Sequence, residues 1–399
     1  MKKILIILLV FVLVLVFSVI AIDPLGFRSP LSPTGVPTIA PTDSIQSLRS
    51  STTTPNFASE IIVDGLSNPW DIIMLPDESY IFSERANKLT HLANGVKKSI
   101  PTPDDTVVRG EGGLLGLAID PEFSSNRFIY ACFNSNLSGN TDVRVVRWKL
   151  SLSNDLLEDR RDIITGIPAN ESGRHSGCQL EFGPDNYLWV GTGDAAIGST
   201  PQDPTSLGGK ILRVDRDGGP ASGNLDQPFD SRIYSYGHRN TQGLAFFEKE
   251  LNLPISGISI EHGSAVDDEV NPLLPGNFGW DPPAGYLEGG VPMTDVQKFP
   301  EAILALWSSG SPTIATSGGT IIKGEKWLKY ENAIAVAAQK GSRIMLLITD
   351  PSLNILQRED IYVNEIGRVR TIQSLKDNEL LILTDNGKGT DRIIRVYPL

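Results

Sequence analysis

The stretch LPDESYIFSER, residues 75–85, places a Pro-Asp turn directly before a strand-like run in which apolar residues alternate. The same order recurs in DPEFSSNRFIYACFN, GPDNYLWVGTGD and LKDNELLILTDNG, which begin at Asp120, Gly183 and Leu375. Weaker copies occur in GLAFFEKELNLPISG and YENAIAVAAQKGSRIMLLITD. One turn pattern that returns along the chain indicates an architecture built from repeated units.

Six copies over about 340 residues leave roughly 57 residues for each unit, which is room for four short strands and their loops. The predicted fold is therefore all-β, a six-bladed β-propeller of four-stranded antiparallel blades. A β-sandwich or a barrel would also contain short alternating strands, but a radial array best explains the recurrence of one turn pattern. The 38 glycines and 27 prolines of the chain also favour a turn-rich fold.

The overall composition excludes several classes of protein. Of 399 residues, 40% are hydrophobic and 21% are charged, which is typical of a globular chain rather than a disordered one. The formal net charge of −12 has the wrong sign for a protein that binds nucleic acid, so no nucleic-acid partner is expected. The two cysteines, Cys132 and Cys178, are too few for a thiolate zinc site and leave either one disulfide or two free thiols.

The amino-terminal region has the pattern of an export signal. Two lysines precede an uncharged apolar run at residues 4–22, so residues 1–22 are expected to be a signal peptide or an N-terminal membrane anchor. Residues 23–56 are rich in Pro, Ser and Thr and are predicted to form a linker. The propeller domain is expected over residues 57–399, in a secreted or cell-surface protein.

Common motifs of other enzyme classes are missing from the sequence. It contains no phosphate-binding G-x-x-x-x-G-K-[ST], no H-E-x-x-H zinc helix and no G-x-S-x-G nucleophile elbow. The four histidines show no i, i+4 spacing, which disfavours a histidine-rich transition-metal site.

Several glycine-rich segments occur in a fixed order: EGGLLGLA from Glu111, RHSG from Arg174, GTGDA from Gly191, GHRNTQGLAF from Gly237, and DDEVN followed by NFGW. With these segments, residues 60–399 resemble the soluble quinoprotein glucose dehydrogenase and aldose sugar dehydrogenase family, also called the glucose/sorbosone dehydrogenases. The resemblance implies a six-bladed propeller that holds pyrroloquinoline quinone (PQQ) and calcium in a pocket on its loop-rich face. It also implies oxidation of an aldose sugar to its lactone, with electrons passed to an external acceptor.

The resemblance assigns catalytic roles to three residues. His175 matches the general base, which takes the hydroxyl proton as hydride leaves the sugar, and an imidazole titrates in the range that this role requires. Asp194 matches the carboxylate that orients the base. Arg239 matches a guanidinium that stabilises charge on the reduced quinone.

The resemblance also supplies cofactor and metal ligands. Cofactor-binding roles fall to Glu111, His175, Arg239, Asn240, Thr313, Lys340, Arg368 and Arg370. Arg368 and Arg370 are two positions apart, so on a strand they would share one face and could bind carboxylates together. The carbonyl groups of Gly263 and Ser264 match donors to the PQQ-linked calcium, and Glu269 matches a ligand of a second calcium.

Departures from the family pattern lie on the substrate side. Glu111 replaces a glutamine, Arg174 an aspartate, and Ser308 and Ser311 an aromatic pair that covers the sugar. These changes favour an open pocket that accepts a range of aldoses, or a different polyol or aldehyde, over a dedicated glucose site. Cys178, close to His175, is interpreted as a packing residue. A non-catalytic extracellular propeller that binds carbohydrate or a protein partner is the alternative, and a calcium-dependent lactonase fits these motifs less well.

Overall fold

A computed structural model describes residues 48–49, 51–283, 285–286, 288–375 and 378–399, all within the unit Thr42–Leu399. The predicted signal peptide or anchor, residues 1–22, lies outside the described residues, and so does most of the predicted linker, residues 23–56. In the part of the chain that is described, no helix is long and apolar enough to cross a membrane.

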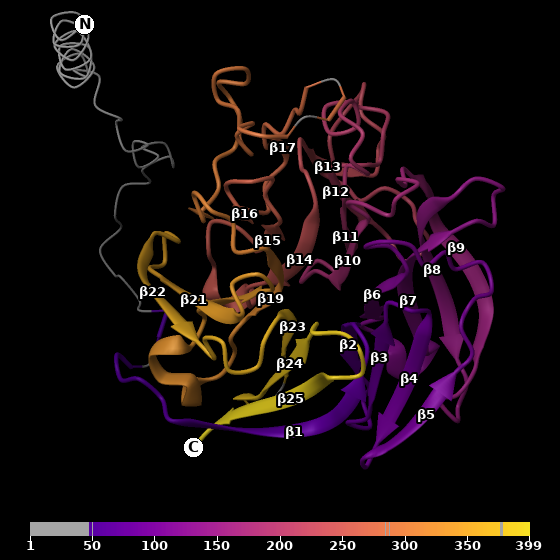
Figure 1. Cartoon of the computed structure of the whole chain (residues 1–399), viewed down its shortest axis with the longest axis vertical. Helices are drawn as coiled ribbons and strands as arrows, with labels where there is room; N and C mark the ends of the chain where they lie inside the picture. The colour runs from indigo at the N-terminus through magenta and orange to yellow at the C-terminus, as the bar shows by residue number, and fades with distance from the viewer. Residues whose placement is uncertain (1–47, 50, 284, 287, 376–377) are drawn as a thin grey trace, which may run out of the picture. The chain divides into compact units, whose positions relative to one another are not determined.

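The described residues form six small sheets, and the innermost strands of these sheets pack side by side in a closed ring (Figure 1). The first blade comprises β2 (Pro69–Met74), β3 (Tyr80–Glu84), β4 (Lys88–Ala93) and β5 (Val96–Ile100). The second comprises β6 (Leu114–Ile119), β7 (Phe128–Ser135), β8 (Asp142–Leu150) and β9 (Leu157–Ile167). The third comprises β10 (Gly177–Phe182), β11 (Leu188–Thr192), β12 (Lys210–Val214) and β13 (Ile233–Tyr236).

The remaining blades follow in chain order. The fourth comprises β14 (Thr241–Phe246), β15 (Gly257–Glu261), β16 (Glu269–Pro272) and β18 (Trp307–Ser308). The fifth comprises β19 (Thr316–Ile321), β20 (Ile334–Ala338), β21 (Arg343–Thr349) and β22 (Ile355–Ile361). The sixth comprises β23 (Val369–Ser374), β24 (Leu380–Thr384), β25 (Asp391–Pro398) and β1 (Phe57–Leu66). Short helical segments are α2 (Phe123–Asn126), η1 (Lys249–Leu251) and η2 (Glu325–Tyr330).

The prediction of an all-β, six-bladed propeller is confirmed, with one addition. The strand pairs within the blades are antiparallel, as expected, but the third blade has a fifth strand, β17 (Gly276–Asn277), which pairs with β13 in parallel. This strand returns from the loop after β16, and it carries the segment that precedes Trp280 to the side of the third blade.

Burial changes from the middle of each blade to its outer edge. Middle strands such as β20 (IAVAA) and β24 (LLILT) are buried on both faces, because each face packs against a neighbouring blade. Outer strands such as β5 (VKKSI) are mostly exposed and carry charged side chains. Charges on an exposed edge strand oppose pairing with another chain.

The repeated turns all occupy equivalent positions. Each connects the first strand of a blade to the second, as between β2 and β3, β6 and β7, or β10 and β11. In the turn at Gly183, the backbone N–H of Gly183 donates to Tyr187 and that of Asn186 donates to Gly183. Because the first strands surround the centre of the ring, these turns gather at one end of the central channel.

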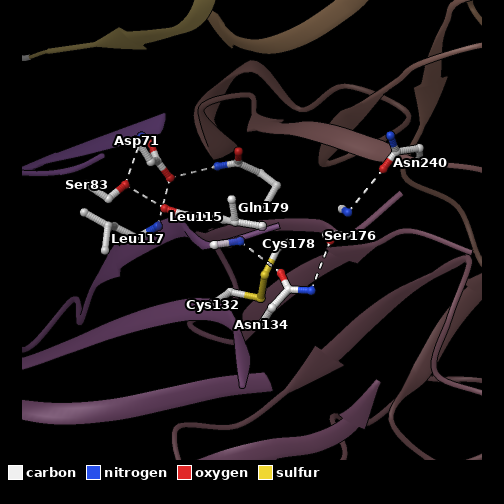
Figure 2. Close-up of a disulfide and its surroundings, with 12 residues drawn as sticks. Asp71, Ser83, Leu115, Leu117, Cys132, Asn134, Ser176, Cys178, Gln179 and Asn240 are labelled. Carbon is white, nitrogen blue, oxygen red and sulfur yellow. Dashed lines mark hydrogen bonds between the residues drawn. A yellow bond between two sulfur atoms is a disulfide. The ribbon is translucent and has the colours of Figure 1, made fainter. Parts of the chain in front are cut away.

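A disulfide joins Cys132 of β7 to Cys178 of β10 and so links the second blade to the third (Figure 2). Both half-cystines are fully buried. Of the two possibilities left by the sequence, the structure has one disulfide, so Cys178 packs in the core as a half-cystine and not as a free thiol. Next to the disulfide, Asn134 Nδ2 donates to Ser176 Oγ at 3.3 Å, a second link between the same blades (Figure 2).

Removing the disulfide is expected to lower the free energy of unfolding. The bond joins positions 46 residues apart, and closing a loop of that size contributes about 2–4 kcal/mol. The double variant Cys132→Ala, Cys178→Ala should show this loss in urea unfolding, and a reducing agent should reproduce it in the wild type but not in the variant. A loss below about 0.5 kcal/mol would contradict the expectation.

Candidate active site

A cavity of about 440 Å³ opens at the end of the central channel opposite the repeated turns. Every blade contributes to it through the segment that enters or begins its innermost strand. The lining residues used below come from all six blades: Trp70, Glu111, Arg174, His175, Arg239, Asn240, Gln242, His262, Gln339, Arg368, Arg370 and Asp385. Side chains distant in the sequence therefore meet at one mouth of the ring.

The His175 imidazole lies in the wall of this cavity with a single carboxylate as its ion-pair partner. His175 Nδ1 is 2.8 Å from Asp194 Oδ1, and both side chains are almost completely buried. Among the described residues, Nε2 has no hydrogen-bond partner. Since Asp194 accepts the Nδ1 proton, the ring presents the Nε2 lone pair, which is the arrangement that a general base requires. The structure brings together these two predicted residues.

The backbone around this pair is shaped by a close approach of two loops. His175 has φ of 51°, and a Cβ on Gly193 would lie 1.9 Å from the His175 carbonyl oxygen. Position 193 therefore admits only glycine without a shift of the backbone. This contact sets Asp194, the next residue, beside the imidazole, so the glycines of the GTGDA segment serve the geometry of the pair.

Asp194 is saturated with hydrogen bonds. Its Oδ1 also accepts the N–H of Ala196 at 2.7 Å, and its Oδ2 accepts the indole N–H of Trp280 at 2.8 Å. The hydroxyl of Tyr286 donates to the same Oδ2. These contacts occupy both oxygens of the buried carboxylate and fix its orientation towards the imidazole.

Arg239 and Glu288 form an ion pair over the cavity. Arg239 Nε donates to Glu288 Oε2 at 2.8 Å, and Arg239 Nη1 donates to the carbonyl of His262, also at 2.8 Å. Glu288 also pairs with Arg174. Burial acts to raise the pKa of Glu288, but contacts with neighbours that include Arg239 and Arg174 act in the opposite direction, and the pKa lies below its ordinary value. The carboxylate therefore stays ionised between two guanidinium groups.

Arg370 is a buried cation with unsatisfied donors. Its Nη1 donates to Gln242 Oε1 at 2.6 Å, and its guanidinium carbon lies 3.7 Å from the centre of the Trp70 ring. Within the part of the chain that the structure describes, its Nε and Nη2 have no hydrogen-bond partner. Burial lowers the pKa of Arg370 to about 10. Buried polar groups in folded proteins are normally hydrogen-bonded, so unpartnered N–H groups at a cavity are typical of a site for an acceptor group.

Arg368 and Asn240 complete the predicted residues in this wall. Arg368 Nη2 donates to Gln339 Oε1 at 2.6 Å, and the Arg368 side chain is exposed. Asn240 Oδ1 accepts the N–H of Gly177 at 3.2 Å and the Gln242 amide at 2.9 Å. Both predicted arginines, Arg368 and Arg370, thus line the same cavity.

Other predicted residues do not line the cavity. Thr313 is buried and Lys340 is exposed, and neither belongs to the lining. Gly263 and Ser264 directly follow His262, which does line it, and the Gly263 carbonyl lies 2.7 Å from His262 Nδ1. In the described ranges, no three side chains of His, Cys, Asp or Glu gather as a metal site.

Glu269 lies away from the cavity, in β16. Its carboxylate accepts hydrogen bonds from Asn271 and Thr294, and β-sheet pairing places it opposite Glu261. Burial, together with the charge of Glu261, raises the pKa of Glu269 well above its ordinary value. Its predicted role as a calcium ligand remains a prediction.

The substrate-side departures occupy different places. Glu111 lines the cavity, and its Oε2 accepts the backbone N–H of His175 at 2.9 Å. Arg174 also lines it, through its pair with Glu288. Ser308 and Ser311 are exposed and lie outside the lining, and Ser308 Oγ donates to Asp267 at 2.8 Å.

Sequence reasoning did not single out several members of the site, namely Trp70, Gln242, His262, Tyr286, Glu288, Gln339 and Asp385. Tyr286, Glu288 and His262 are the three that contact the predicted catalytic residues directly. Tyr286 and Glu288 lie together in one loop segment. The available signal was the glycine spacing of the segment, Gly285 and then Gly289 and Gly290, which is typical of a loop that approaches other backbone closely.

The repeated turns surround a second cavity, of about 710 Å³, at the other end of the channel. It contains Glu181, and burial, together with the charge of Asp71, raises the pKa of Glu181 to about 8. A carboxyl group with a raised pKa stabilises the fold while it is protonated. That stability is complete below the ordinary pKa of 4.5 and is lost as the pH rises towards 8.

Glu181→Gln is therefore expected to raise the melting temperature at about pH 8 by about 2 °C or more, with little effect at about pH 4. Thermal unfolding followed by circular dichroism at both pH values measures this difference. Glu248→Gln, which changes an exposed carboxylate of the same cavity, is the matched control. Equal effects of Glu181→Gln at both pH values would refute the expectation.

Together, the fold and the cavity define a six-bladed propeller with a histidine–carboxylate pair and several arginines at one mouth of its channel. The sequence model described as Glucose / Sorbosone dehydrogenase matches residues 66–395, so the chain belongs to this family of oxidoreductases.

Individual relatives agree with this assignment. An aldose sugar dehydrogenase of Escherichia coli is 27% identical over 359 residues, which cover 85% of this chain and 92% of that protein. The quinoprotein glucose dehydrogenase B of Acinetobacter calcoaceticus is 29% identical over 267 residues, 58% of this chain and 54% of that one. The PQQ-bound aldose sugar dehydrogenase of Streptomyces coelicolor superposes with a TM-score of 0.71 at 28% identity, covering 86% of this chain and 99% of that one.

Proposed function

We propose that this protein is an exported, PQQ- and calcium-dependent dehydrogenase that oxidises aldose sugars to lactones. The observation that carries the proposal is the His175–Asp194 pair, held at 2.8 Å in the wall of a cavity that also contains the unpartnered N–H groups of Arg370. One side of such a site can remove a proton, and the other can bind an anionic cofactor.

The residues present fit PQQ, a planar quinone with three carboxylates. Buried guanidinium groups bind carboxylates with paired, charge-assisted hydrogen bonds, and Arg370 has two N–H groups without other partners. Arg239, Asn240 and Arg368 lie in the same wall and would contribute further donors. When bound, PQQ supplies the acceptor for a hydride, which no side chain of the protein can replace.

The chain's own residues would perform the proton transfer. Asp194 holds the Nδ1 proton of His175, which leaves Nε2 free to accept the proton of the sugar hydroxyl. The imidazolium formed in this way gains stability from the Asp194 anion. Arg239 would stabilise negative charge that develops across the cavity, and its ion pair with Glu288 fixes the position of the guanidinium group.

Calcium is part of the proposal because carbonyl oxygens are hard donors that suit this ion. The donors would be the carbonyl groups of Gly263 and Ser264, next to His262 in the cavity wall. Glu269 is the proposed ligand of a second calcium. Removal of calcium by a chelator is expected to abolish activity, and added calcium is expected to restore it.

Export and an external electron acceptor complete the proposal. The buried Cys132–Cys178 disulfide supports export, because such bonds persist in oxidising compartments. Residues 1–22 would direct the chain out of the cytoplasm, as a cleaved signal or as an anchor at residues 4–22. The open substrate side, with Ser308 and Ser311 outside the cavity, supports use of several aldoses rather than one.

A dye-reduction assay with the full chain and a panel of aldoses tests this function. Reduction that depends on sugar and on both PQQ and calcium would support it, and the panel would rank the substrates. No reduction with any aldose, together with no PQQ binding in an absorbance titration, would refute it. That result would favour a propeller that binds carbohydrate or protein without catalysis.

A further inference from the structure

Tyr286 reaches the His175–Asp194 pair from a separate loop. Its hydroxyl donates to Asp194 Oδ2, and its oxygen lies 3.0 Å from His175 Nδ1. The Tyr286 ring meets the His175 ring edge-on, with the ring centres 5.6 Å apart. One tyrosine hydroxyl therefore contacts both members of the pair.

These contacts indicate which atom donates and which atom accepts in each hydrogen bond. The Tyr286 proton points to Asp194 Oδ2, so the lone pairs of its oxygen face His175 Nδ1. Nδ1–H thus lies between two acceptors, Asp194 Oδ1 and Tyr286 Oη. This arrangement fixes the neutral imidazole in the tautomer that has its free lone pair on Nε2.

The backbone of Tyr286 adds an independent observation. Its φ is 54°, in the left-handed region that large side chains rarely adopt. Such a conformation persists where the surrounding contacts determine it, and it occurs preferentially at functional sites. The Tyr286 N–H donates to the Pro283 carbonyl at 3.0 Å, which closes the turn that presents the ring.

We propose that Tyr286 is a positioning residue of this enzyme: its hydroxyl holds Asp194 and sets the tautomer of His175. The proposal rests on the proposed function, in which His175 is the base. The hydroxyl donates to Asp194 Oδ2 and offers a second acceptor to Nδ1–H, so both contacts favour the tautomer that has its proton on Nδ1. Without the hydroxyl, a larger share of neutral His175 would carry its proton on Nε2.

The remaining charged groups near His175 stay in place when only this hydroxyl is removed. They are Glu111, which accepts the His175 backbone N–H, and Glu288 with its partners Arg174 and Arg239. Trp280 continues to donate to Asp194 at 2.8 Å. Tyr286→Phe therefore changes one hydrogen-bonding group in an otherwise constant field.

The first test needs no cofactor and no turnover. The chain has four histidines, so NMR of histidine-labelled apoprotein resolves few ring signals, and the His175→Ala variant identifies that of His175. In the neutral ring, the two nitrogen shifts report which nitrogen carries the proton, and Tyr286→Phe is expected to increase the share of the Nε2–H tautomer. Ring nitrogen shifts that match those of the wild type would overturn the proposal.

The second test uses steady-state kinetics of the loaded enzyme. Because the Nε2–H tautomer cannot accept the sugar proton, kcat is expected to fall about tenfold with the sugar KM within about twofold. The matched control is Tyr187→Phe, whose ring lies against Arg213 in the turn between β10 and β11. If kcat falls while the ring nitrogen shifts of His175 stay as in the wild type, the role is structural and the proposal fails. If the wild type oxidises no sugar, the proposed function fails. The NMR test would then still show whether the Tyr286 hydroxyl determines the tautomer of His175.

Discussion

Replacing His175 with alanine is expected to lower kcat by about 10²–10⁴-fold, because the general base of the proposed reaction is lost. The imidazole is buried in the cavity wall and has Asp194 as its partner, so the variant leaves a buried carboxylate with the donors Trp280, Tyr286 and Ala196. Those donors keep Asp194 in place, and the fold is expected to persist. Single-turnover kinetics with the PQQ-loaded protein measures the loss directly.

The control for this prediction is His91→Gln. His91 Nε2 lies 2.9 Å from Ser79 Oγ in the first blade, away from the cavity, and glutamine can keep that hydrogen bond. The control should retain wild-type kcat. A His175→Ala variant with more than about a tenth of wild-type kcat would show that another group removes the proton.

Replacing Arg370 with methionine is expected to weaken PQQ binding about 100-fold while leaving the melting temperature of the apoprotein unchanged or higher. A factor of 100 corresponds to about 2.7 kcal/mol. The affinity for PQQ falls because the variant lacks a buried guanidinium whose Nε and Nη2 groups make no hydrogen bond to other described residues. The apoprotein does not depend on Arg370 in the same way. A buried cation stabilises a fold poorly when it has one hydrogen bond and no ion-pair partner among the described residues.

Absorbance titration with PQQ and thermal unfolding of the apoprotein measure the two effects separately. Arg395→Met removes a partly exposed arginine of β25 that pairs with Glu60, and it should leave the PQQ affinity unchanged. Binding by Arg370→Met within about threefold of the wild type would contradict the assignment of Arg370 to the cofactor. A large fall in the apoprotein melting temperature would instead assign Arg370 mainly to stability.

The fold could be predicted because its signal is local. A turn such as the one at Gly183 needs only residues close together in sequence, and the alternation that follows depends on the two faces of a single strand. The turn lies between the first and second strands in each of the six blades. The parallel strand β17 could not be predicted in this way, since two residues give no alternation and the pairing with β13 depends on the path of a long loop.

Residues of the site could be predicted only where they lie in sequence motifs that resemble those of the family. His175 and Asp194 lie in such motifs, and the structure places them in contact. Tyr286 and Glu288 lie in no such motif. Their contacts with Asp194 and Arg239 arise where a loop packs against other blades. Lys340 shows the opposite case: it lies in a matching segment, yet its neighbour Gln339 lines the cavity and Lys340 does not.

The sixth blade has a consequence for the timing of assembly. Its outer strand, β1 (Phe57–Leu66), pairs with β25 (Asp391–Pro398), and Figure 1 shows the two strands side by side at the edge of the ring. β1 must therefore stay unpaired until β25 has been synthesised, and such distant pairings form slowly. The ring stays open during synthesis. Because all six blades line the cavity of about 440 Å³, that cavity is complete only after β25 has closed the ring onto β1.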